Sequence, residues 1–328
     1  MLNDAHVHFF SPAFFDTLGR QKGLGPGAAV AALGWDDPVS PDALADRWVA
    51  ELDRHGVSRA ALIASVPGDE ASVGAALARH PARFVGFFML DPTADDAVAR
   101  ARAALDAGHR GICLFPAMQR YSLHDDRVAA IFDLADSHAA AKPPLPASRE
   151  AASPSEGEER PSPNAPAGRG PTPEGRPVIF VHCGVLSVGV RGKLGLPSPF
   201  DMRFGNPLDL HDLAGRFPRV PIVIPHFGAG LFREALMLAS ACPNVHLDTS
   251  SSNAWIKVVP GLTLPQVFSA ALDVLGPDRL LFGSDSSFFP RGWHAAIHVA
   301  QQAALGEARV PPDTRARIFG GNFNRLFP

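Results

Sequence analysis

Short apolar runs alternate with longer amphipathic stretches along most of the chain. In the longer stretches, apolar residues recur every three or four positions, which is the spacing of a helix that packs one face against a sheet. We interpret the short runs as buried strands, namely 2–8, 59–65, 84–90, 111–116, 178–184, 221–228, 244–250 and 279–285. The predicted helices between them are 41–56, 71–81, 94–108, 126–136, 230–242, 264–276 and 292–305.

Near-continuous apolar strands that alternate with helices are typical of a parallel sheet covered by helices. Because eight such strands are present, we expect the sheet to close into a (β/α)8 TIM barrel, which is an α/β fold. A doubly wound open sheet is the alternative, but no G-x-G-x-x-G motif follows the first strand. Of the 328 residues 46% are hydrophobic, which suits a single barrel domain over residues 1–328.

The segment 139–177 differs in composition from the rest of the chain. It holds ten of the 32 prolines, five basic and five acidic residues, and no aromatic residue. Such a segment buries too little apolar surface to offset the entropy lost on ordering. We therefore expect a low-complexity, disordered, proline-rich insertion between strands 4 and 5. It follows a helix and precedes a strand, so we expect it to lie away from the catalytic rim of the barrel.

Composition also limits the partners of the protein. The net charge of −3 shows no basic surplus, so nucleic acid is not an expected partner. No run approaches the roughly 18 apolar residues of a membrane span, and no secretory signal is recognisable, because the candidate site begins at residue 6. The three cysteines form no C-x-x-C motif and are typical of reduced thiols. We expect a cytoplasmic protein that acts on a small-molecule substrate.

Polar residues stand at the ends of the predicted strands. In "DAHVH" the side chains of His6 and His8 are two positions apart, so in a strand they point to the same face. Three further polar residues end later strands: His182, His226 and Asp285. In a TIM barrel the carboxyl ends of the strands converge on one site. Imidazole and carboxylate groups there suit Zn2+, with Mn2+, Fe2+ or Co2+ as alternatives.

The combination of motifs resembles a known family. The motifs are "DAHVH", "VIFVHCG", "IVIPHFG", "NVHLDTSS", "LLFGSDSSF" and "IFGGNFNRLF". Together they resemble the amidohydrolase superfamily, and within it the amidohydrolase-2 group, which includes aminocarboxymuconate-semialdehyde decarboxylase-like metal-dependent enzymes. The resemblance covers nearly the whole chain except 139–177.

The resemblance implies the roles of the strand-end residues. It implies that one divalent metal ion is bound by His6, His8, His182 and Asp285. It also implies that His226 acts on the substrate or on the metal-bound water. Binuclear members carry a bridging lysine on strand 4, whereas "GICLFPAM" has none, so a single metal is expected. A homodimer is a further expectation from the resemblance.

Two reactions are compatible with such a site. A metal-activated water can attack an ester, lactone or amide carbonyl, with Asp285 taking the proton and His226 polarising the carbonyl or moving a proton. The chain would then be a mononuclear metal-dependent hydrolase. The alternative is a non-oxidative decarboxylase (a carboxy-lyase) in which the same metal and histidine protonate a carbon of a small aromatic or muconate-type acid.

The substrate-binding residues are harder to assign. Arg203 follows strand 5 and can hold a substrate carboxylate in a bidentate pair, or be an ordinary surface arginine. Asn253 and Trp255 follow strand 7 and are candidates for lining the pocket, although Trp255 also suits packing of the loop.

Two acidic residues are candidates for a supporting role. Asp248 ends strand 7 and suits either a hydrogen-bond acceptor for a metal-bound histidine or a helix-capping or loop role. Asp4 is predicted to lie on the same face as His6 and His8 and to help position them. Histidines on helices or helix ends, such as His109, are predicted to be solvated.

Overall fold

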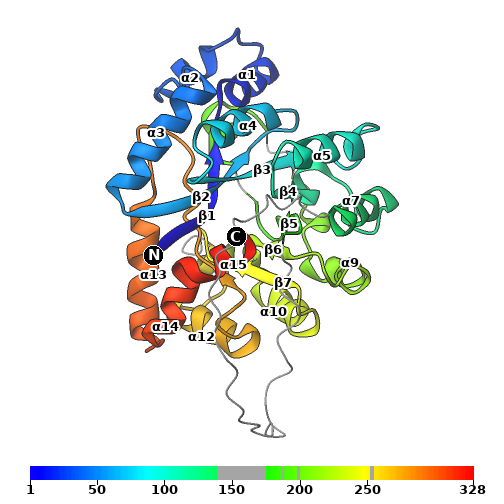
Figure 1. Cartoon of the computed structure of the whole chain (residues 1–328), viewed down its shortest axis with the longest axis vertical. Coiled ribbons are helices and arrows are strands. Elements are labelled where there is room, and N and C mark those ends of the chain that lie inside the picture. Colours follow the sequence, from blue (N-terminus) through cyan, green and yellow to red (C-terminus); the bar gives the residue numbers. More distant parts are fainter. Residues whose placement is uncertain (139–174, 187, 198–199, 252–254) are drawn as a thin grey trace, which may run out of the picture.

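The strands of the computed structural model form one parallel sheet in the order β1 to β8 (Figure 1). The structure describes residues 1–138, 175–186, 188–197, 200–251 and 255–328. The strands are β1 (Leu2–Phe9), β2 (Val57–Ala64), β3 (Phe84–Leu90), β4 (Gly111–Leu114), β5 (Val178–Val181), β6 (Ile222–Ile224), β7 (Val245–Asp248) and β8 (Leu280–Leu281). The predicted TIM barrel is therefore confirmed.

Helices surround the strands on the outside of the barrel (Figure 1). The predicted helices are α3 (Pro41–Arg54), α4 (Glu70–Arg79), α5 (Ala97–Asp106), α7 (Asp126–Ser137), α10 (Phe232–Ala241), α12 (Leu264–Leu275) and α13 (Ala295–Glu307). Further helices were not predicted: α1 (Pro12–Gln21), α2 (Ala28–Leu33), α6 (Pro116–Gln119), α8 (Gly189–Lys193), α9 (His211–Arg216), α14 (Pro312–Ala316) and α15 (Asn322–Leu326). Except for α1, they have at most six residues, too few for the apolar spacing to define a helical face.

Alternate residues of the strands fill the inside and the outside of the barrel. Ile63, Phe87 and Phe180 belong to the inner apolar cluster, whereas their strand neighbours pack against the helices. Phe323 of α15 and Phe327 at the chain end join the inner cluster, so the C-terminal segment closes one end of the barrel. In Figure 1 α15 lies over the centre of the ring of strands.

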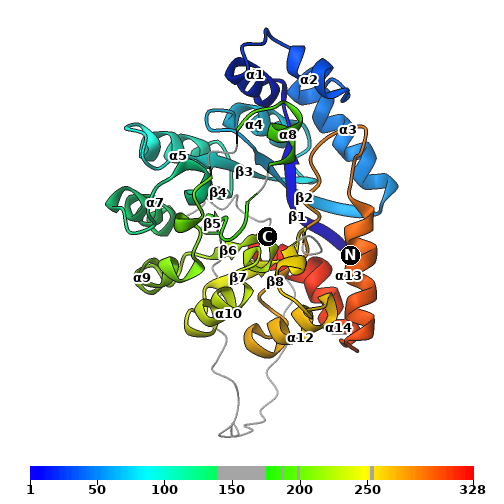
Figure 2. The same cartoon turned by 180° about the vertical axis from the view of Figure 1, so that it is seen from behind.

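A second group of short elements packs on the barrel near the first strand. Apolar residues of α1, α2 and α8 form one cluster that includes Phe14, Val30 and Val190. Figure 2 shows α8 beside α1, although more than 150 residues separate these two helices in the sequence. This cluster places the loop after β5 next to the segment after β1.

The first strand contains an irregularity that changes which residues face inward. Asp4 pairs with Ala60 and Val7 with Leu62, so three residues of β1 span two of β2. Ala60 packs on the outside, and Asp4 therefore faces outward, where it is fully buried. The prediction that Asp4 shares a face with His6 and His8 is wrong, because strict alternation does not survive a bulge. Burial raises the pKa of Asp4 to about 6.

The proline-rich insertion lies almost wholly outside the described residues. Residues 139–174 follow α7 and precede β5, so the predicted position between strands 4 and 5 is confirmed. Among the described residues, every helix is too short or too polar to cross a membrane.

Candidate metal centre

The strand-end residues gather at the carboxyl end of the barrel. His6 and His8 lie on β1, and His182 directly follows β5. His226 lies in the turn Pro225–Gly228 after β6, where its backbone has a φ of 56°. Asp285 follows β8 and is linked to β1 by a hydrogen bond from its backbone N–H to the carbonyl oxygen of His6 (3.0 Å).

The glycine of "VHCG" allows two of these histidines to approach. Gly184 has a φ of 76°, and a Cβ atom there would lie 2.2 Å from the carbonyl oxygen of Gly228. Only glycine permits this contact between the turns after β5 and β6. The ring centroids of His182 and His226 are consequently 5.1 Å apart.

Three side chains point their ligand atoms at one another. The Nε2 atoms of His6 and His8 are 3.3 Å apart. The Oδ1 atom of Asp285 lies 3.3 Å from His8 Nε2 and 3.7 Å from His6 Nε2. All three can thus serve as ligands of one ion.

The partners of the other ring nitrogens define the tautomers. His6 Nδ1 lies 2.8 Å from Oδ2 of Asp248, and because a carboxylate only accepts, Nδ1 carries the hydrogen. His8 Nδ1 lies 2.8 Å from the Ser65 hydroxyl, which donates its own hydrogen to the Ile63 carbonyl (2.9 Å). Both neutral rings therefore present a bare Nε2 lone pair to the site.

The residues fit a divalent metal ion. Two lone pairs 3.3 Å apart repel each other unless a cation lies between them. Two nitrogen ligands of a tetrahedral Zn2+, each at 2.0–2.1 Å, lie about 3.3–3.4 Å apart, which agrees with the observed separation. In addition, His182 Nδ1 is buried and has no hydrogen-bond partner in the described part of the chain. Such an orphaned nitrogen is costly unless a ligand satisfies it.

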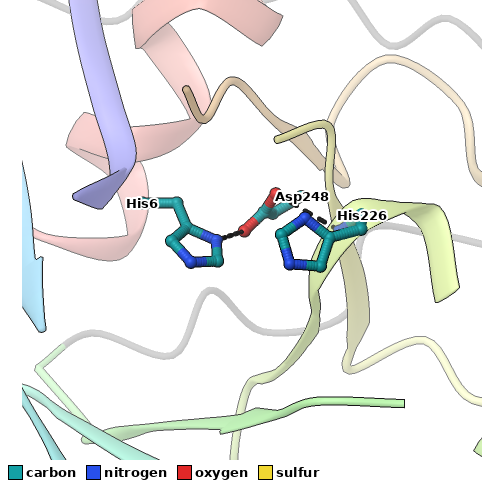
Figure 3. Close-up of side chains that lie close together, drawn as sticks. All are labelled: His6, His226 and Asp248. Atoms are coloured by element: carbon teal, nitrogen blue, oxygen red, sulfur yellow. Dashed lines mark hydrogen bonds and ion pairs between the residues drawn. The ribbon is translucent and has the colours of Figure 1, made fainter. Parts of the chain in front are cut away.

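His182 does not join the other three within ligand distance in this structure. Within the described ranges, two groups of ligand atoms lie within 4.8 Å of one another: His6, His8 and Asp285, and His6, His226 and Asp248. The second group, shown in Figure 3, is hydrogen-bonded: Asp248 accepts from the Nδ1 atom of His6. We therefore interpret Asp248 as a supporting residue of the metal centre, one of the two roles predicted for it.

Ser250 links the two rings of Figure 3. Its hydroxyl oxygen lies 2.9 Å from Nδ1 of His6 and 2.9 Å from Nδ1 of His226, and the hydroxyl donates to Asp248. The carbonyl oxygen of Ser250 lies 2.8 Å from His226 Nδ1, which must donate to it. His226 thus also has a free Nε2 in its neutral form.

Burial and charge set the protonation of the centre. Burial lowers the pKa of His226 and of His8, which favours neutral rings. Burial opposes a charged His6 as well, but the neighbouring Asp248 raises the pKa of His6 overall. Burial also disfavours a charged Asp285, yet the nearby His8, His6 and His226 hold its pKa well below the usual range. A cluster of imidazoles with a carboxylate is a typical donor set for a divalent cation.

Two of the three predicted substrate residues, Arg203 and Trp255, lie among the described residues. Arg203 is 84% exposed and pairs with Asp201. Trp255 is buried against Phe232, with ring centroids 5.7 Å apart, as expected for a packing role. Asn253 lies outside the described residues. Their roles in substrate binding stay predictions.

Sequence reasoning missed some residues and misplaced one. Ser65 directly follows β2 and Ser250 lies two residues after β7, so the strand-end rule that singled out the histidines applies to them too. His109, predicted to be solvated, is instead buried, with its ring packed edge-on against Phe88. Its Nδ1 atom donates to the Ala104 carbonyl (3.1 Å).

Comparisons with known proteins agree with the fold and the motifs. Residues 172–328 match the family model described as Amidohydrolase. A zinc-bound amidohydrolase from Burkholderia multivorans is 16% identical, with a TM-score of 0.58, and the match covers 99% of this chain and 98% of that one. An uncharacterised TIM-barrel protein from Bordetella bronchiseptica is 16% identical, with a TM-score of 0.61 and coverage of 99% and 97%.

A third structure is assigned as a 2-pyrone-4,6-dicarboxylic acid hydrolase from Pseudomonas putida. It is 19% identical, with a TM-score of 0.57 and coverage of 99% of this chain and 97% of that one. No curated protein matches the chain. These structural similarities show the barrel fold, and the family model matches residues 172–328, which carry His182, His226 and Asp285. The C-terminal part of the chain, residues 172–328, therefore resembles the amidohydrolase family.

Proposed function

We propose that this enzyme is a mononuclear metal-dependent hydrolase that acts on an ester, lactone or amide of a small molecule. The observation that carries the proposal is the convergence of His6 Nε2, His8 Nε2 and Asp285 Oδ1 within 3.3–3.7 Å. We assign one divalent metal ion, preferably Zn2+, to these residues, with His182 as the fourth ligand. Its Nδ1 atom, buried and without a partner among the described residues, supports this assignment.

The residues of the chain divide the work of hydrolysis. A divalent cation held there lowers the pKa of a water molecule and polarises a carbonyl oxygen. His226 keeps its hydrogen on Nδ1 through the Ser250 carbonyl, so its free Nε2 atom is a proton acceptor toward the site. Asp285 is the second proton acceptor of the site. Asp248 and Ser65 keep the rings of His6 and His8 in the tautomer that binds metal.

The structural neighbours favour hydrolysis over decarboxylation. The Pseudomonas putida neighbour is assigned to hydrolysis of a 2-pyrone, which is a cyclic ester. We therefore place lactones first among the candidate substrates. Decarboxylation of a small aromatic or muconate-type acid is the competing reaction, because the same metal ligands and His226 suit it.

The test combines metal analysis with a reaction screen. We expect one bound divalent metal per chain by plasma mass spectrometry. The metal-loaded enzyme, assayed by proton release on dihydrocoumarin, other lactones and p-nitrophenyl esters, should be active. The metal-stripped enzyme should be inactive and recover activity with Zn2+, Mn2+ or Co2+.

A matched variant separates binding from chemistry. His226→Gln should retain the metal but lose at least about 100-fold in turnover, since a positioned general base contributes 10²–10⁴-fold. Release of carbon dioxide from aromatic acids, with no hydrolysis of any lactone, ester or amide, would replace the proposal by the carboxy-lyase reaction. A protein without stoichiometric metal would refute both.

A further inference from the structure

The buried carboxylate of Asp4 has no place in the proposed reaction. It is 0% exposed and faces away from the metal centre, on the outer side of β1. In the described part of the chain it makes no ion pair. A buried charge without a counter-ion is costly unless several hydrogen bonds compensate for it. This cost indicates that the carboxylate of Asp4 has a structural or functional role.

Four hydrogen bonds compensate for the charge. The Oδ1 atom of Asp4 accepts from the backbone N–H of His6 (3.0 Å) and from the backbone N–H of Ser284 (3.0 Å). The Oδ2 atom accepts from the Ser284 hydroxyl (2.5 Å) and from Nε1 of Trp293 (2.7 Å). The Oδ1 atom of Asp4 therefore links the backbone of the proposed metal ligand His6 to the backbone of Ser284. Ser284 directly precedes Asp285, which is another proposed metal ligand.

These bonds cross the seam where the barrel closes. Strand β8 has only two residues, so few ladder bonds connect the last strand to the first. Ala5 N–H donates to the Phe282 carbonyl (2.8 Å) and His8 N–H to the Ser286 carbonyl (2.7 Å). His6 and His8 stand on one side of this seam and Asp285 on the other. Their separation depends on how firmly the seam is held.

We propose that Asp4 is a positioning residue that fixes the distance between His6 and Asp285 across the barrel seam, and thereby the affinity for the metal. The inference rests on the metal centre of the proposed function. We call the four hydrogen bonds of Asp4 the clamp. Ser284 extends the clamp, because its hydroxyl lies 2.6 Å from the hydroxyl of Ser286, which accepts from the backbone N–H of His294 (2.8 Å). The clamp thus ties β1 to the loop that leads into α13.

The chemistry requires a carboxylate at this position. All four partners are donors, and only a carboxylate accepts with both ends. An asparagine of the same size has one accepting oxygen and an NH2 group, which would face at least one donor. Asp4→Asn therefore breaks the clamp without changing the volume of the side chain.

The test measures metal binding, so no substrate is needed. Full-length wild type and Asp4→Asn are titrated with Zn2+ against a chelator, and with Co2+ by visible absorption. We expect Asp4→Asn to bind Zn2+ about 10–100-fold more weakly, the loss typical for a partner of a metal ligand. Its Co2+ spectrum should change, because the ligands no longer hold one geometry, while the far-UV circular dichroism stays that of the wild type.

Thr249→Val is the matched control for a general loss of stability. It breaks the buried hydrogen bond from the Thr249 hydroxyl to the Gln301 side chain (2.7 Å), which joins β7 to α13 and does not touch the seam. It should lower the melting temperature and leave the Zn2+ affinity and the Co2+ spectrum unchanged.

The outcomes separate this inference from the proposed function. Wild-type Zn2+ affinity in Asp4→Asn overturns the positioning role and leaves the proposed function standing. A wild type that binds no Zn2+ overturns both. If Asp4→Asn does not fold, Ser284→Ala removes one donor and keeps the carboxylate. It should weaken Zn2+ binding about tenfold, at the low end of the same range, and an unchanged affinity would again overturn the role.

Discussion

The two ends of the barrel are built from opposite kinds of residue. At the carboxyl end, buried and half-buried histidines and carboxylates face one another, and atoms such as His182 Nδ1 lack a partner among the described residues. At the other end, α15 and the chain terminus insert Phe323, Leu326 and Phe327 among the inner residues of the strands. The first arrangement costs stability, and the second supplies it. The difference indicates that binding and folding stability can be changed separately in this molecule.

The largest effect on stability is expected at the closed end. Phe323 is 2% exposed, and its ring contacts Phe327 with centroids 5.0 Å apart. Phe323→Ala should lower the free energy of unfolding by about 3–4 kcal/mol, as is usual for a buried phenylalanine. Urea denaturation of the metal-free protein measures this loss. The Zn2+ affinity of the folded variant should stay that of the wild type, and a large loss of affinity would show that the two ends are coupled.

At the carboxyl end of the barrel we expect the reverse result, a large loss of Zn2+ affinity with a smaller loss of stability. Asp285→Asn removes the charged ligand, and we expect the Zn2+ affinity to fall by at least about 100-fold, or about 2.7 kcal/mol. The stability of the metal-free protein should change less than the affinity, because the Asp285 side chain is 30% exposed and the cost of desolvating its charge offsets part of what the histidines contribute. Chelator competition and urea denaturation measure the two quantities on the same samples. Unchanged affinity would remove Asp285 from the metal centre.

His246 on β7 is a buried polar side chain toward the closed end of the barrel. It pairs with Val223 of the inner cluster, and neither ring nitrogen has a partner within the described residues. Burial and the nearby Arg279 lower its pKa to about 3, so the ring is neutral in the folded protein. The unfolded chain takes up a proton below pH 6.5 and the folded chain does not, so stability falls with pH between about 6.5 and 3.

His246→Leu should remove this sensitivity to acid. Relative to the variant, the wild type should lose about 2 kcal/mol between neutral pH and pH 5, at up to 1.36 kcal/mol per pH unit. Urea denaturation of both proteins between pH 7 and pH 5 measures the difference. A difference that does not vary with pH would mean that the ring takes up its proton as readily in the folded protein as in the unfolded chain. His109→Leu serves as a comparison, because His109 is another buried histidine whose pKa is lowered by burial. Its effect on stability should vary with pH in the same direction.

The same contrast explains how far the sequence alone could lead. All eight strands could be predicted, because burial on both sides makes them nearly continuous apolar runs. The convergence of His6, His8 and Asp285 followed from the rule that parallel strands end at one mouth. The direction of Asp4 did not follow, because a bulge shifts the alternation by one residue and leaves no mark in the apolar pattern. The closure by α15 also escaped, since so short a helix shows no periodicity.

The finest comparison concerns the two partners that orient the β1 histidines. Asp248 offers His6 a charged acceptor, whereas Ser65 offers His8 a neutral hydroxyl at the same 2.8 Å. Because a charge-assisted hydrogen bond is roughly twice as strong, Asp248→Asn should weaken Zn2+ binding toward about 100-fold and Ser65→Ala only about tenfold. Chelator competition on the two variants gives both values. Equal losses would mean that orientation of the rings, and not the charge of Asp248, is what these partners contribute to the metal centre.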